Sequence, residues 1–512
     1  MNRLDNQYRV PGPFAVLTLM LLLAGCSAGE VLLNTDSPNV PMPNEEFRGV
    51  WVASVANIDW PSRTDLSTEE QKRELRQILD RAQRLNFNAI VLQVRPAADA
   101  LYESSLEPWS EYLTGEMGRP PSPFYDPLEF AVNEAHNRGL ELHAWVNPFR
   151  ARHPTATSPN TPDHVSQRKP GAVVAYGEYL WMNPGDPVAQ EHSLAVMLDI
   201  VERYDIDGLH IDDYFYPYEI QDSTGTVVEF PDGGVYAQYL ATGDTLAIAD
   251  WRRMSIDRFV EQLYQGIKRV KPHVKFGISP FGIWRPGNPP QIQGYDPYEK
   301  LYADSRKWLK EGWVDYFTPQ LYWKIDVPEQ SYSALLDWWI AQNDKGRHIW
   351  PGNFTSRVFL EGDRRWDPVE IINQVELTQD TGGASGNVHF SMKSLFDNGT
   401  GMAFELGAGP YRAPAIVPAT RWLGAETPPR PMLRIEDLGT GDLVTFGMAD
   451  GSPEVARWIV WRFDNDSWVT EILGGWRSGV FISAEDEETA GVAVAAISRT
   501  GVVGPVAAIR RD

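Results

Sequence analysis

Residues 206–218 have the sequence IDGLHIDDYFYPY, in which apolar and polar side chains alternate ahead of two aspartates. Leu209 and Ile211 fall on one side of an extended chain, because side chains alternate along a strand. His210 and Asp212 fall on the other side. Residues 206–211 are mostly apolar, as is typical of a parallel strand that is covered on both faces. The stretch therefore predicts a buried strand that ends in two neighbouring carboxylates.

Further apolar runs of this kind occur along residues 47–423, and segments with helical patterns separate them. Such an alternation of strand and helix is typical of an α/β fold with a parallel sheet. We therefore expect a (β/α)8 TIM-type barrel with long loops. A doubly wound open sheet is the alternative, but no glycine-rich phosphate loop follows the first run. The predicted strands are residues 47–54, 88–95, 140–147, 206–213, 274–279, 314–322, 347–353 and 387–393.

The predicted helices begin at residues that cap helices. Ser67 and Glu70 form a capping box ahead of an apolar helical face. Other helices begin with Asp-Pro, since aspartate accepts hydrogen bonds from the free amides of the first turn. Proline fits that turn because its missing N–H would be unpaired there. The pairs are Asp126-Pro127, Asp186-Pro187, Asp296-Pro297 and Asp367-Pro368.

The pattern changes after residue 423. Residues 427–431 (TPPRP) form a stiff linker, and short β-rich runs with glycine-containing turns follow, such as residues 455–463 and 491–498. These runs predict a small β-sandwich, and its last hairpin resembles that of fibronectin type III modules. Whether this unit binds a ligand or acts as a spacer is left open. We expect a barrel at residues 46–424 and a fibronectin type III-like β-sandwich at 425–512.

The amino-terminal segment predicts export and a lipid anchor. Residues 14–25 are an apolar run of about the length of a secretory signal, preceded by Arg3 and Arg9. The run ends in Leu-Ala-Gly-Cys26, which resembles a bacterial lipobox, and Cys26 is the only cysteine of the chain. Its acyl chains would hold the protein on a membrane surface. We expect a signal peptide at residues 1–25, a flexible tether at 26–45, and attachment to the outer membrane facing the periplasm.

Composition excludes several classes of function. The chain has 512 residues and a formal net charge of −23, and such an acidic protein repels nucleic-acid phosphates. One cysteine cannot form an intramolecular disulfide or a cysteine-based zinc site. No glycine-flanked nucleophilic serine of the Gly-x-Ser-x-Gly type is present. We expect no nucleic-acid partner, no cofactor and no metal.

The polar residues of the predicted strands share one parity. In a barrel alternate side chains point into the bore while the others face the helices. The helix-facing set is apolar, so the polar set lines the bore toward its carboxyl-terminal mouth. Unpaired polar groups are costly to bury, which favours an active-site floor over a water-filled structural network. These predicted site residues are Arg95, His143, Trp145, Asn147, His210, Asp212, Ser279, Gln320 and Tyr322.

Asp212 and Asp213 are the candidate catalytic carboxylates. Glycoside hydrolysis needs two carboxyl groups that flank a sugar. Adjacent residues of a strand point in different directions, so we expect a second acid from another loop, and Asp99 is the first candidate. We expect Asp212 as nucleophile or base, with Asp213 or Asp99 as acid or charge partner. Other carboxylates left open are Glu107, Glu178, Glu219 and Glu405.

A metal site is the weaker interpretation of these residues. His143, His210 and Asp212 fall on neighbouring strands, but no HxH or HExxH spacing supports a metal there. Aromatic residues at the ends of the strands instead favour a sugar, because a flat ring stacks on its C–H face. Arg95 suits a sugar with a carboxylate, and a structural ion pair is the alternative for it. The aromatic candidates include Trp145, Tyr214, Tyr322 and Trp323.

Several motifs occur together and in order along the barrel: RGVWV (48–52), QVRP (93–96), DALY (99–102), EPWS (107–110), HAWVNP (143–148), DGLHIDDYFYP (207–217), SPFG (279–282) and PQLYW (319–323). Together they resemble the glycosyl-hydrolase-like family 10 lipoproteins. The resemblance implies a (β/α)8 barrel, glycosidase activity and a place in the cell envelope. It also implies a glycan partner, peptidoglycan strands stripped of stem peptides, and an association with the division machinery or with wall amidases.

The sequence thus predicts a lipid-anchored hydrolase of O-glycosidic bonds in an envelope glycan. Two alternatives stay open at this point. One is a glycosidase of another polysaccharide. The other is a non-catalytic lipoprotein that binds glycan through its aromatic cleft and β-sandwich.

Overall fold

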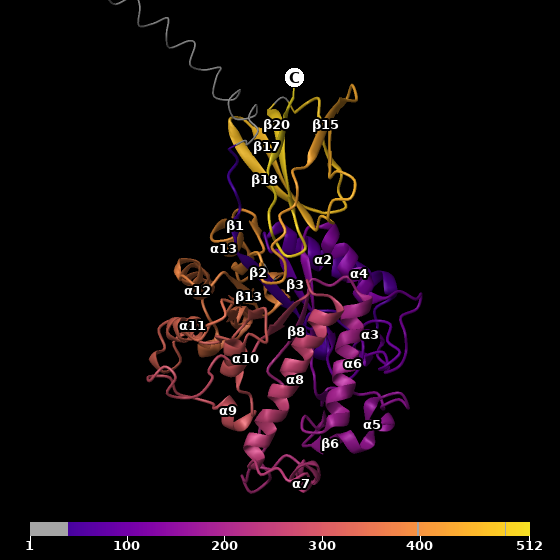
Figure 1. The fold of residues 1–512 in the computed structure, drawn as a ribbon, viewed down its shortest axis with the longest axis vertical. Coiled ribbons are helices and arrows are strands. Elements are labelled where there is room, and N and C mark those ends of the chain that lie inside the picture. The colour runs from indigo at the N-terminus through magenta and orange to yellow at the C-terminus, as the bar shows by residue number, and fades with distance from the viewer. Residues whose placement is uncertain (1–38, 397–398, 487, 512) are drawn as a thin grey trace, which may run out of the picture.

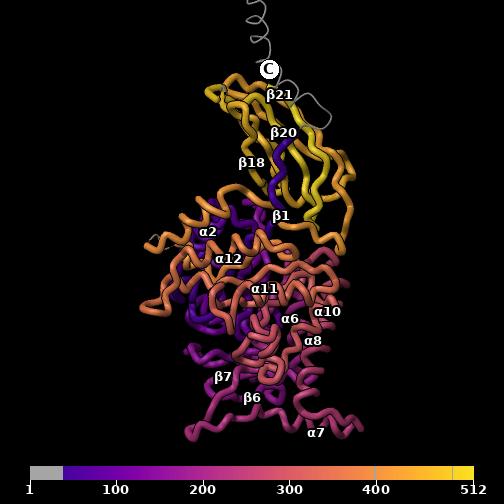
Figure 2. Tube along the Cα trace, turned by 90° about the vertical axis from the view of Figure 1, so that its left-hand side faces the viewer, coloured from indigo at the N-terminus to yellow at the C-terminus, as the bar shows by residue number. Residues whose placement is uncertain are grey.

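The computed structural model describes residues 39–396, 399–486 and 488–511. The predicted signal peptide, Cys26 and most of the predicted tether lie outside these residues. Figure 1 shows an α/β body with a β-sandwich at one end, and Figure 2 shows the same arrangement from the side. In the described part of the chain, no helix combines the length and the apolar character needed to cross a membrane.

The body is built on a parallel sheet, which has nine strands within the described residues. Neighbouring strands pair in parallel throughout, and helices surround them (Figure 1). In their order across the sheet the strands are β11 (His348–Ile349), β10 (Tyr316–Phe317), β9 (Lys275–Ile278), β8 (Gly208–Ile211), β4 (Glu141–Val146), β3 (Ala89–Arg95), β2 (Phe47–Val52), β13 (Gly386–His389) and β12 (Gly352–Asn353).

The two edges of this sheet belong to one predicted strand, residues 347–353. Its first half, β11, pairs with β10, and its second half, β12, pairs with β13. Only Trp350 and Pro351 separate the halves. The sheet therefore closes on itself, and the predicted (β/α)8 barrel is confirmed.

The helices begin where the sequence predicts. Ser67 and Glu70 form the capping box of α2, and the four Asp-Pro pairs cap α4, α6, α9 and α12. The outer helices are α2 (Thr68–Arg84), α4 (Pro127–Asn137), α6 (Pro187–Arg203), α8 (Ile248–Val270), α9 (Pro297–Lys300), α10 (Ser305–Glu311), α11 (Tyr332–Ala341), α12 (Pro368–Asp380) and α13 (Met402–Ala408). Loops add α3 (Glu111–Thr114), β5 (Arg150–Arg152), α5 (Val165–Arg168), β6 (Val173–Tyr176), β7 (Tyr179–Met182) and α7 (Gly233–Ala241).

The carboxyl-terminal strands form the predicted β-sandwich. One antiparallel sheet has the order β15-β16-β19, and the other has the order β18-β17-β20-β21. Side chains from both sheets, such as Phe446 and Trp458, meet in one core. The strands are β15 (Met432–Asp437), β16 (Gly441–Gly447), β17 (Arg457–Asp464), β18 (Ser467–Gly474), β19 (Gly479–Ser483), β20 (Thr489–Ile497) and β21 (Ala507–Arg510).

The sandwich packs against the amino-terminal ends of the barrel strands. Arg457 of β17 binds Glu141 at the start of β4 at 2.8 Å, and Trp422 donates a hydrogen bond to Asp315, just before β10. The end of the predicted tether joins the same region, because β1 (Asn44–Glu45) pairs with β14 (Ala415–Ile416). The carboxyl-terminal mouth of the barrel lies at the opposite end and is free of the sandwich (Figure 1).

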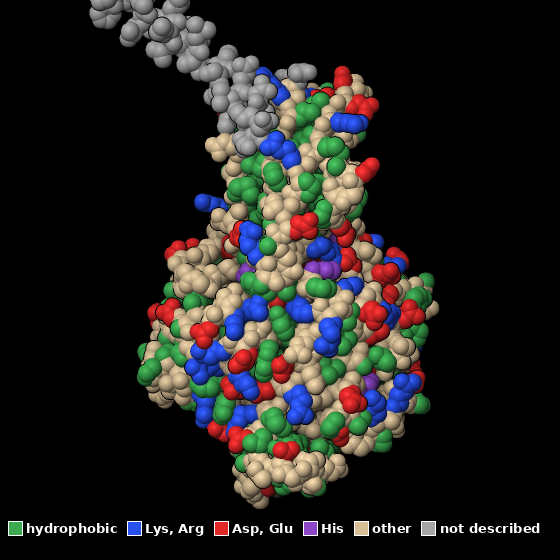
Figure 3. Space-filling view, viewed as in Figure 1, with side chains coloured by type: hydrophobic (Ala, Val, Ile, Leu, Met, Phe, Trp, Pro, Cys, Tyr) green, Lys and Arg blue, Asp and Glu red, His purple; other side chains and the backbone are tan. Residues whose placement is uncertain are grey.

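The surface of the barrel carries both signs of charge. Figure 3 shows basic and acidic side chains interspersed over the helices that face the viewer. This mixture differs from the basic stripe with which proteins commonly bind nucleic acid.

The bore imposes a glycine at position 277. A Cβ added there would lie 1.9 Å from the ring of Tyr316, which is buried and stacks on Trp350. We expect Gly277→Ala to lower the free energy of unfolding by roughly 1–3 kcal/mol, since overpacking a tight core has that cost. Chemical denaturation measures the change. Gly171→Ala is the matched control, because no atom lies within 4 Å of the added Cβ, and equal stability of the two variants would contradict the prediction.

Candidate active site

A cavity of about 350 Å³ opens at the carboxyl-terminal ends of the barrel strands. This is the end at which (β/α)8 barrels carry their active sites. Strands β4, β8, β9 and β10, or the residues that follow them, each bring a polar or aromatic side chain to it. Of the predicted site residues, the cavity is lined by Trp145, Asp212, Asp213, Tyr214, Ser279, Gln320 and Tyr322.

Asp212 lies at the bottom of this cavity and is 4% exposed. Its carboxylate accepts hydrogen bonds from the Trp145 indole at 3.2 Å and the Asn147 amide at 3.3 Å. The pKa of Asp212 is raised to about 7, chiefly by burial; Arg150 opposes the rise, and the neighbouring Asp213 adds to it. The side chain therefore exchanges a proton near neutral pH, which suits a general acid or base.

Asp213 turns to the other side of the same cavity. The hydroxyl of Tyr218 donates a hydrogen bond of 2.5 Å to its Oδ2. Burial also raises the pKa of Asp213, while the bond from Tyr218 acts in the opposite direction because it stabilises the ionised form. Two neighbouring buried carboxyl groups repel each other when both are charged, so the pair favours a state that holds one proton.

The aromatic prediction holds for part of the mouth. Trp51, Trp145, Tyr214, Tyr218 and Tyr322 line the cavity together with Phe390. Three other aromatic residues that the sequence places at or just after strand ends, Trp60, Trp181 and Tyr216, are fully buried and belong to the core of the barrel. The cavity thus presents flat rings around two carboxyl groups, as a sugar-binding site requires.

Arg150 is the residue that the sequence analysis missed. It follows β4 on the short strand β5, lines the cavity and is 4% exposed. Its guanidinium lies 4.3 Å from the centre of the Tyr214 ring. A charged residue just beyond the third predicted strand was the available signal, because that is where barrel enzymes place catalytic and binding groups. Gln93, His153 and Tyr218 also line the cavity.

His143 and His210 do not line the cavity, which corrects the expectation that they bind substrate. Both are fully buried below its floor, and their Nδ1 atoms lie 2.8 Å and 3.0 Å from the Tyr316 hydroxyl. Trp51 donates a hydrogen bond to Nε2 of His210, and Ser279 bonds the same atom. The two histidines are thus committed to a hydrogen-bonded column inside the bore.

Arg95 and Asp99 are also placed outside the cavity. Arg95 is fully buried and forms a bidentate pair with Glu107, whose oxygens lie 2.6 Å and 2.7 Å from Nη2 and Nε. Its role is therefore the structural ion pair, with a glutamate from the following loop as partner. The Asp99 carboxylate accepts a hydrogen bond from the amide of Ala97, and burial raises its pKa to about 6.

Asn147 and Trp323 are two predicted site residues that lie outside the cavity lining. The Oδ1 of Asn147 accepts hydrogen bonds from the amides of Phe149 and Arg150, while its Nδ2 holds Asp212 from behind. Trp323 packs on Phe281, with 5.6 Å between ring centroids. Neither residue lines the cavity. Asn147 nevertheless positions two groups that do.

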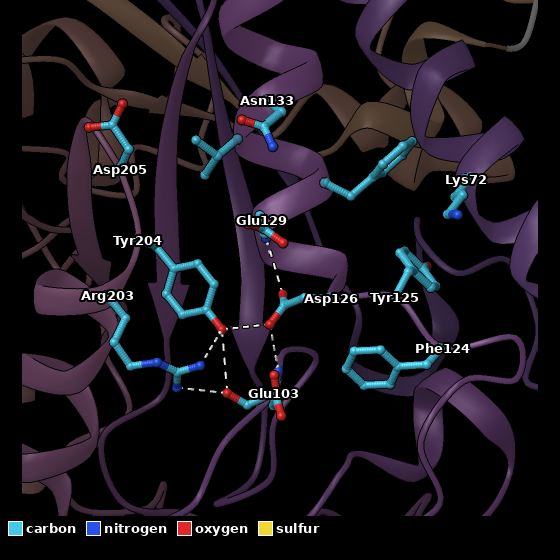
Figure 4. Close-up of a pocket in the computed structure, with 12 residues that line it drawn as sticks. Lys72, Glu103, Phe124, Tyr125, Asp126, Glu129, Asn133, Arg203, Tyr204 and Asp205 are labelled. Atoms are coloured by element: carbon cyan, nitrogen blue, oxygen red, sulfur yellow. Dashed lines mark hydrogen bonds between the residues drawn. The ribbon is translucent and has the colours of Figure 1, made fainter.

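A larger cavity, of about 650 Å³, lies on the outer flank of the barrel between α4 and α6 (Figure 4). Several of its polar groups bind one another. Tyr204 donates a hydrogen bond of 2.6 Å to Asp126, and Arg203 donates one of 2.7 Å to the carbonyl of Glu103. Figure 4 shows these side chains turned toward each other. We therefore place the active site at the barrel mouth.

The described residues contain no group of three or more His, Cys, Asp or Glu side chains arranged to hold a metal ion. The weaker His143–His210–Asp212 interpretation fails on geometry, because the histidines bind Tyr316 while Asp212 binds Trp145 and Asn147.

The sequence comparisons show the family of the chain. A family model described as glycosyl hydrolase-like 10 matches residues 46–366, which span both carboxylates and the strands around them. The chain belongs to the glycosyl hydrolase-like 10 family. As a member of the glycosyl hydrolase-like 10 family it is a glycosidase, and the alternative of a non-catalytic binding protein is set aside.

Named relatives share most of the barrel. The chain is 42% identical over 399 residues to the glycosyl hydrolase YngK of Bacillus subtilis (strain 168), with 76% of each protein covered. It is 32% identical over 362 residues to the glycosyl hydrolase DigH of Escherichia coli (strain K12), which covers 65% of this chain and 80% of that protein. Among solved structures, it is similar to the PgaB (BpsB) glycoside hydrolase domain from Bordetella bronchiseptica, with 17% identity and a TM-score of 0.46 over 71% of this chain and 98% of that one.

The environment of Asp212 predicts a pH-dependent gain of stability when its charge is removed. With a pKa of about 7 in the folded chain and about 3.9 in the unfolded chain, the folded state binds more protons between these values. Stability of the wild type therefore falls as pH rises through this range. We expect Asp212→Asn to exceed wild type in free energy of unfolding by about 2 kcal/mol more at pH 8 than at pH 5.

Denaturant titrations of both proteins at the two pH values measure this difference. Asp337→Asn, at an exposed position of α11, controls for the loss of one negative charge. If the difference in free energy of unfolding between Asp212→Asn and wild type is the same at pH 5 and pH 8, this contradicts the assignment of a raised pKa to the carboxyl group of Asp212.

Proposed function

We propose that this glycosidase cleaves O-glycosidic bonds of an envelope glycan, with peptide-free peptidoglycan strands as its substrate. The observation that carries the proposal is the buried Asp212–Asp213 pair in a cavity walled by aromatic rings. The motifs shared with the family support this substrate. Glycosidic hydrolysis needs a proton for the leaving oxygen and a carboxylate near the sugar carbon, and the pair supplies both.

The geometry supports a division of labour between the two carboxyl groups. Asp212, with a pKa of about 7, donates its proton to the glycosidic oxygen as the C–O bond breaks. Asp213, held by Tyr218, remains the carboxylate that stabilises the positive charge developing on the sugar ring. Water then adds its hydroxyl to the anomeric carbon, and its proton returns to the carboxyl pair. The sequence alone favoured Asp212 as nucleophile or base, and its environment now favours the acid.

The setting of the enzyme belongs to the same proposal. Cys26 would carry lipid and hold the barrel at the outer membrane, facing the periplasm, because the lipobox-like Leu-Ala-Gly-Cys precedes the tether. Stem peptides leave peptidoglycan by amide hydrolysis, so an amidase reaction must supply the substrate. The expected association with wall amidases or the division machinery follows from this order of reactions.

Product analysis tests the substrate and the catalytic residue together. Full-length protein in detergent is incubated with amidase-treated and with untreated peptidoglycan, and released fragments are identified by mass spectrometry. We expect fragments from the amidase-treated strands, and a loss of about 10³-fold in rate for Asp212→Asn, in the range for removing a general acid. Asp99→Asn is the matched control, since Asp99 is equally buried but lies outside the cavity.

Two results would contradict the proposal. Equal rates for Asp212→Asn and wild type would remove Asp212 from the chemistry. Cleavage of another polysaccharide, with none of either peptidoglycan preparation, would keep the glycosidase and replace its substrate.

A further inference from the structure

Arg150 is a buried cation that no described carboxylate contacts, although Asp212 and Asp213 line the same cavity. No carboxylate of the described residues lies within 4.0 Å of its nitrogen atoms, and its Nε has no hydrogen-bond acceptor. Its remaining polar contact is 3.5 Å, from Nη1 to the carbonyl of Pro96. A buried charge is costly unless it is paired, so such an arginine needs a partner from elsewhere.

Every other buried arginine in the described part of the chain has its carboxylate. These pairs measure 2.6–2.8 Å, and they are spread over the barrel and the sandwich, so pairing is the rule for this fold. They are Arg48–Glu46, Arg95–Glu107, Arg252–Asp232, Arg253–Asp250 and Arg457–Glu141.

The surroundings of Arg150 hold it ready for a ligand. The Tyr214 ring, 4.3 Å from its Cζ, supports the flat face of the guanidinium. The amide of Arg150 donates a hydrogen bond of 2.8 Å to Asn147 Oδ1, which fixes the backbone beside Asp212. Arg150 shares the cavity with both carboxyl groups but forms an ion pair with neither. An arginine that is oriented in this way presents a fork of N–H donors that matches a carboxylate.

We propose that Arg150 binds a carboxylate of the substrate, so that the cavity selects an anionic glycan over its neutral counterpart. This inference rests on the proposed glycosidase function and specifies the substrate class of the same site. Removal of a stem peptide by amide hydrolysis leaves a free lactyl carboxylate on the sugar, where the intact strand has a neutral amide. Arg150 thus distinguishes the two kinds of strand, because only the strand without the peptide carries this carboxylate. A uronic acid residue in another polysaccharide offers the same chemistry.

The experiment compares one glycan with and without its negative charge. Amidase-treated strands are used as they are and after their carboxyl groups have been coupled to methylamine, which restores a neutral amide. A soluble polyuronate is the third substrate. Full-length wild type, Arg150→Gln and Arg150→Lys are assayed for kcat/KM on each. Arg152→Gln is the matched control, because Arg152 lies on the same strand β5 but binds Asn160 outside the cavity.

Wild type is expected to prefer the carboxylate form of the strands at least tenfold over the methylamide form. Arg150→Gln should reduce this ratio to about one, Arg150→Lys should keep part of it, and Arg152→Gln should keep all of it. A role of Arg150 in balancing the charges of Asp212 and Asp213 would instead lower both rates by the same factor and leave the ratio unchanged. That result would overturn the proposal.

Results on the three substrates distinguish a failure of this inference from a failure of the proposed function. Equal cleavage of both strand forms by wild type would overturn the role of Arg150 and leave the peptidoglycan substrate standing. Cleavage of the polyuronate alone, lost in Arg150→Gln, would support Arg150 and replace the substrate. Equilibrium binding of the same glycans to Asp212→Asn, with and without Arg150→Gln, gives the comparison without turnover, and binding that ignores the carboxylate would overturn the proposal.

Discussion

The hydrogen bonds between Tyr316 and the two histidines of the bore connect the floor of the active site to the opposite end of the barrel. Trp51 can only donate, so His210 accepts at Nε2 and donates from Nδ1 to the Tyr316 hydroxyl. Tyr316 then donates to His143, and His143 donates to Glu141. The column runs from Trp51 and Ser279, which line the cavity, to Glu141 at the end of the barrel that the sandwich covers. Every polar group of this buried column therefore has a partner.

The two ends of the bore shift the pKa of a buried carboxyl group in opposite directions. Although burial acts to raise the pKa of Glu141, Lys275 and Arg457 bind its Oε1 at 2.9 Å and 2.8 Å and hold that pKa at about 2. Asp212 has no such cation in contact, and burial leaves its pKa at about 7. Glu141 is thus a fixed structural charge, whereas Asp212 is poised to move a proton. Carboxyl groups whose environments separate their pKa values in this way are assigned to different roles.

Much of the fold was predictable because its signals are local. Capping residues such as Ser67 and Asp126 mark helix starts, and the strands are nearly continuous apolar runs. Parity also predicts that His143 and His210 enter the bore, where both bond Tyr316. Parity does not tell how far a side chain lies from the mouth of the barrel, because each successive residue of a strand lies about 3.3 Å further along it. His143 and His210 each lie two residues before a side chain that lines the cavity, Trp145 and Asp212, and both bond Tyr316 in the column.

Partners supplied by loops were beyond sequence reasoning. Arg95 does not face the bore as predicted, because the pairing of β3 with β4 shifts between Gln93 and Arg95. It pairs instead with Glu107 from the following loop, which also bonds His192 of α6. Arg150, which the parity argument could not reach because it follows β4, takes the place at the cavity that was expected of Arg95. Which arginine meets a substrate is thus decided by the carboxylates that the loops bring to each.

The dependence of kcat on pH shows whether Asp212 is the proton donor of the buried pair. On a glycan that the enzyme cleaves, we expect kcat to fall as pH rises through about 7, where Asp212 loses its proton. A profile that instead rises through the same pH range would make Asp212 a base or nucleophile and not the proton donor.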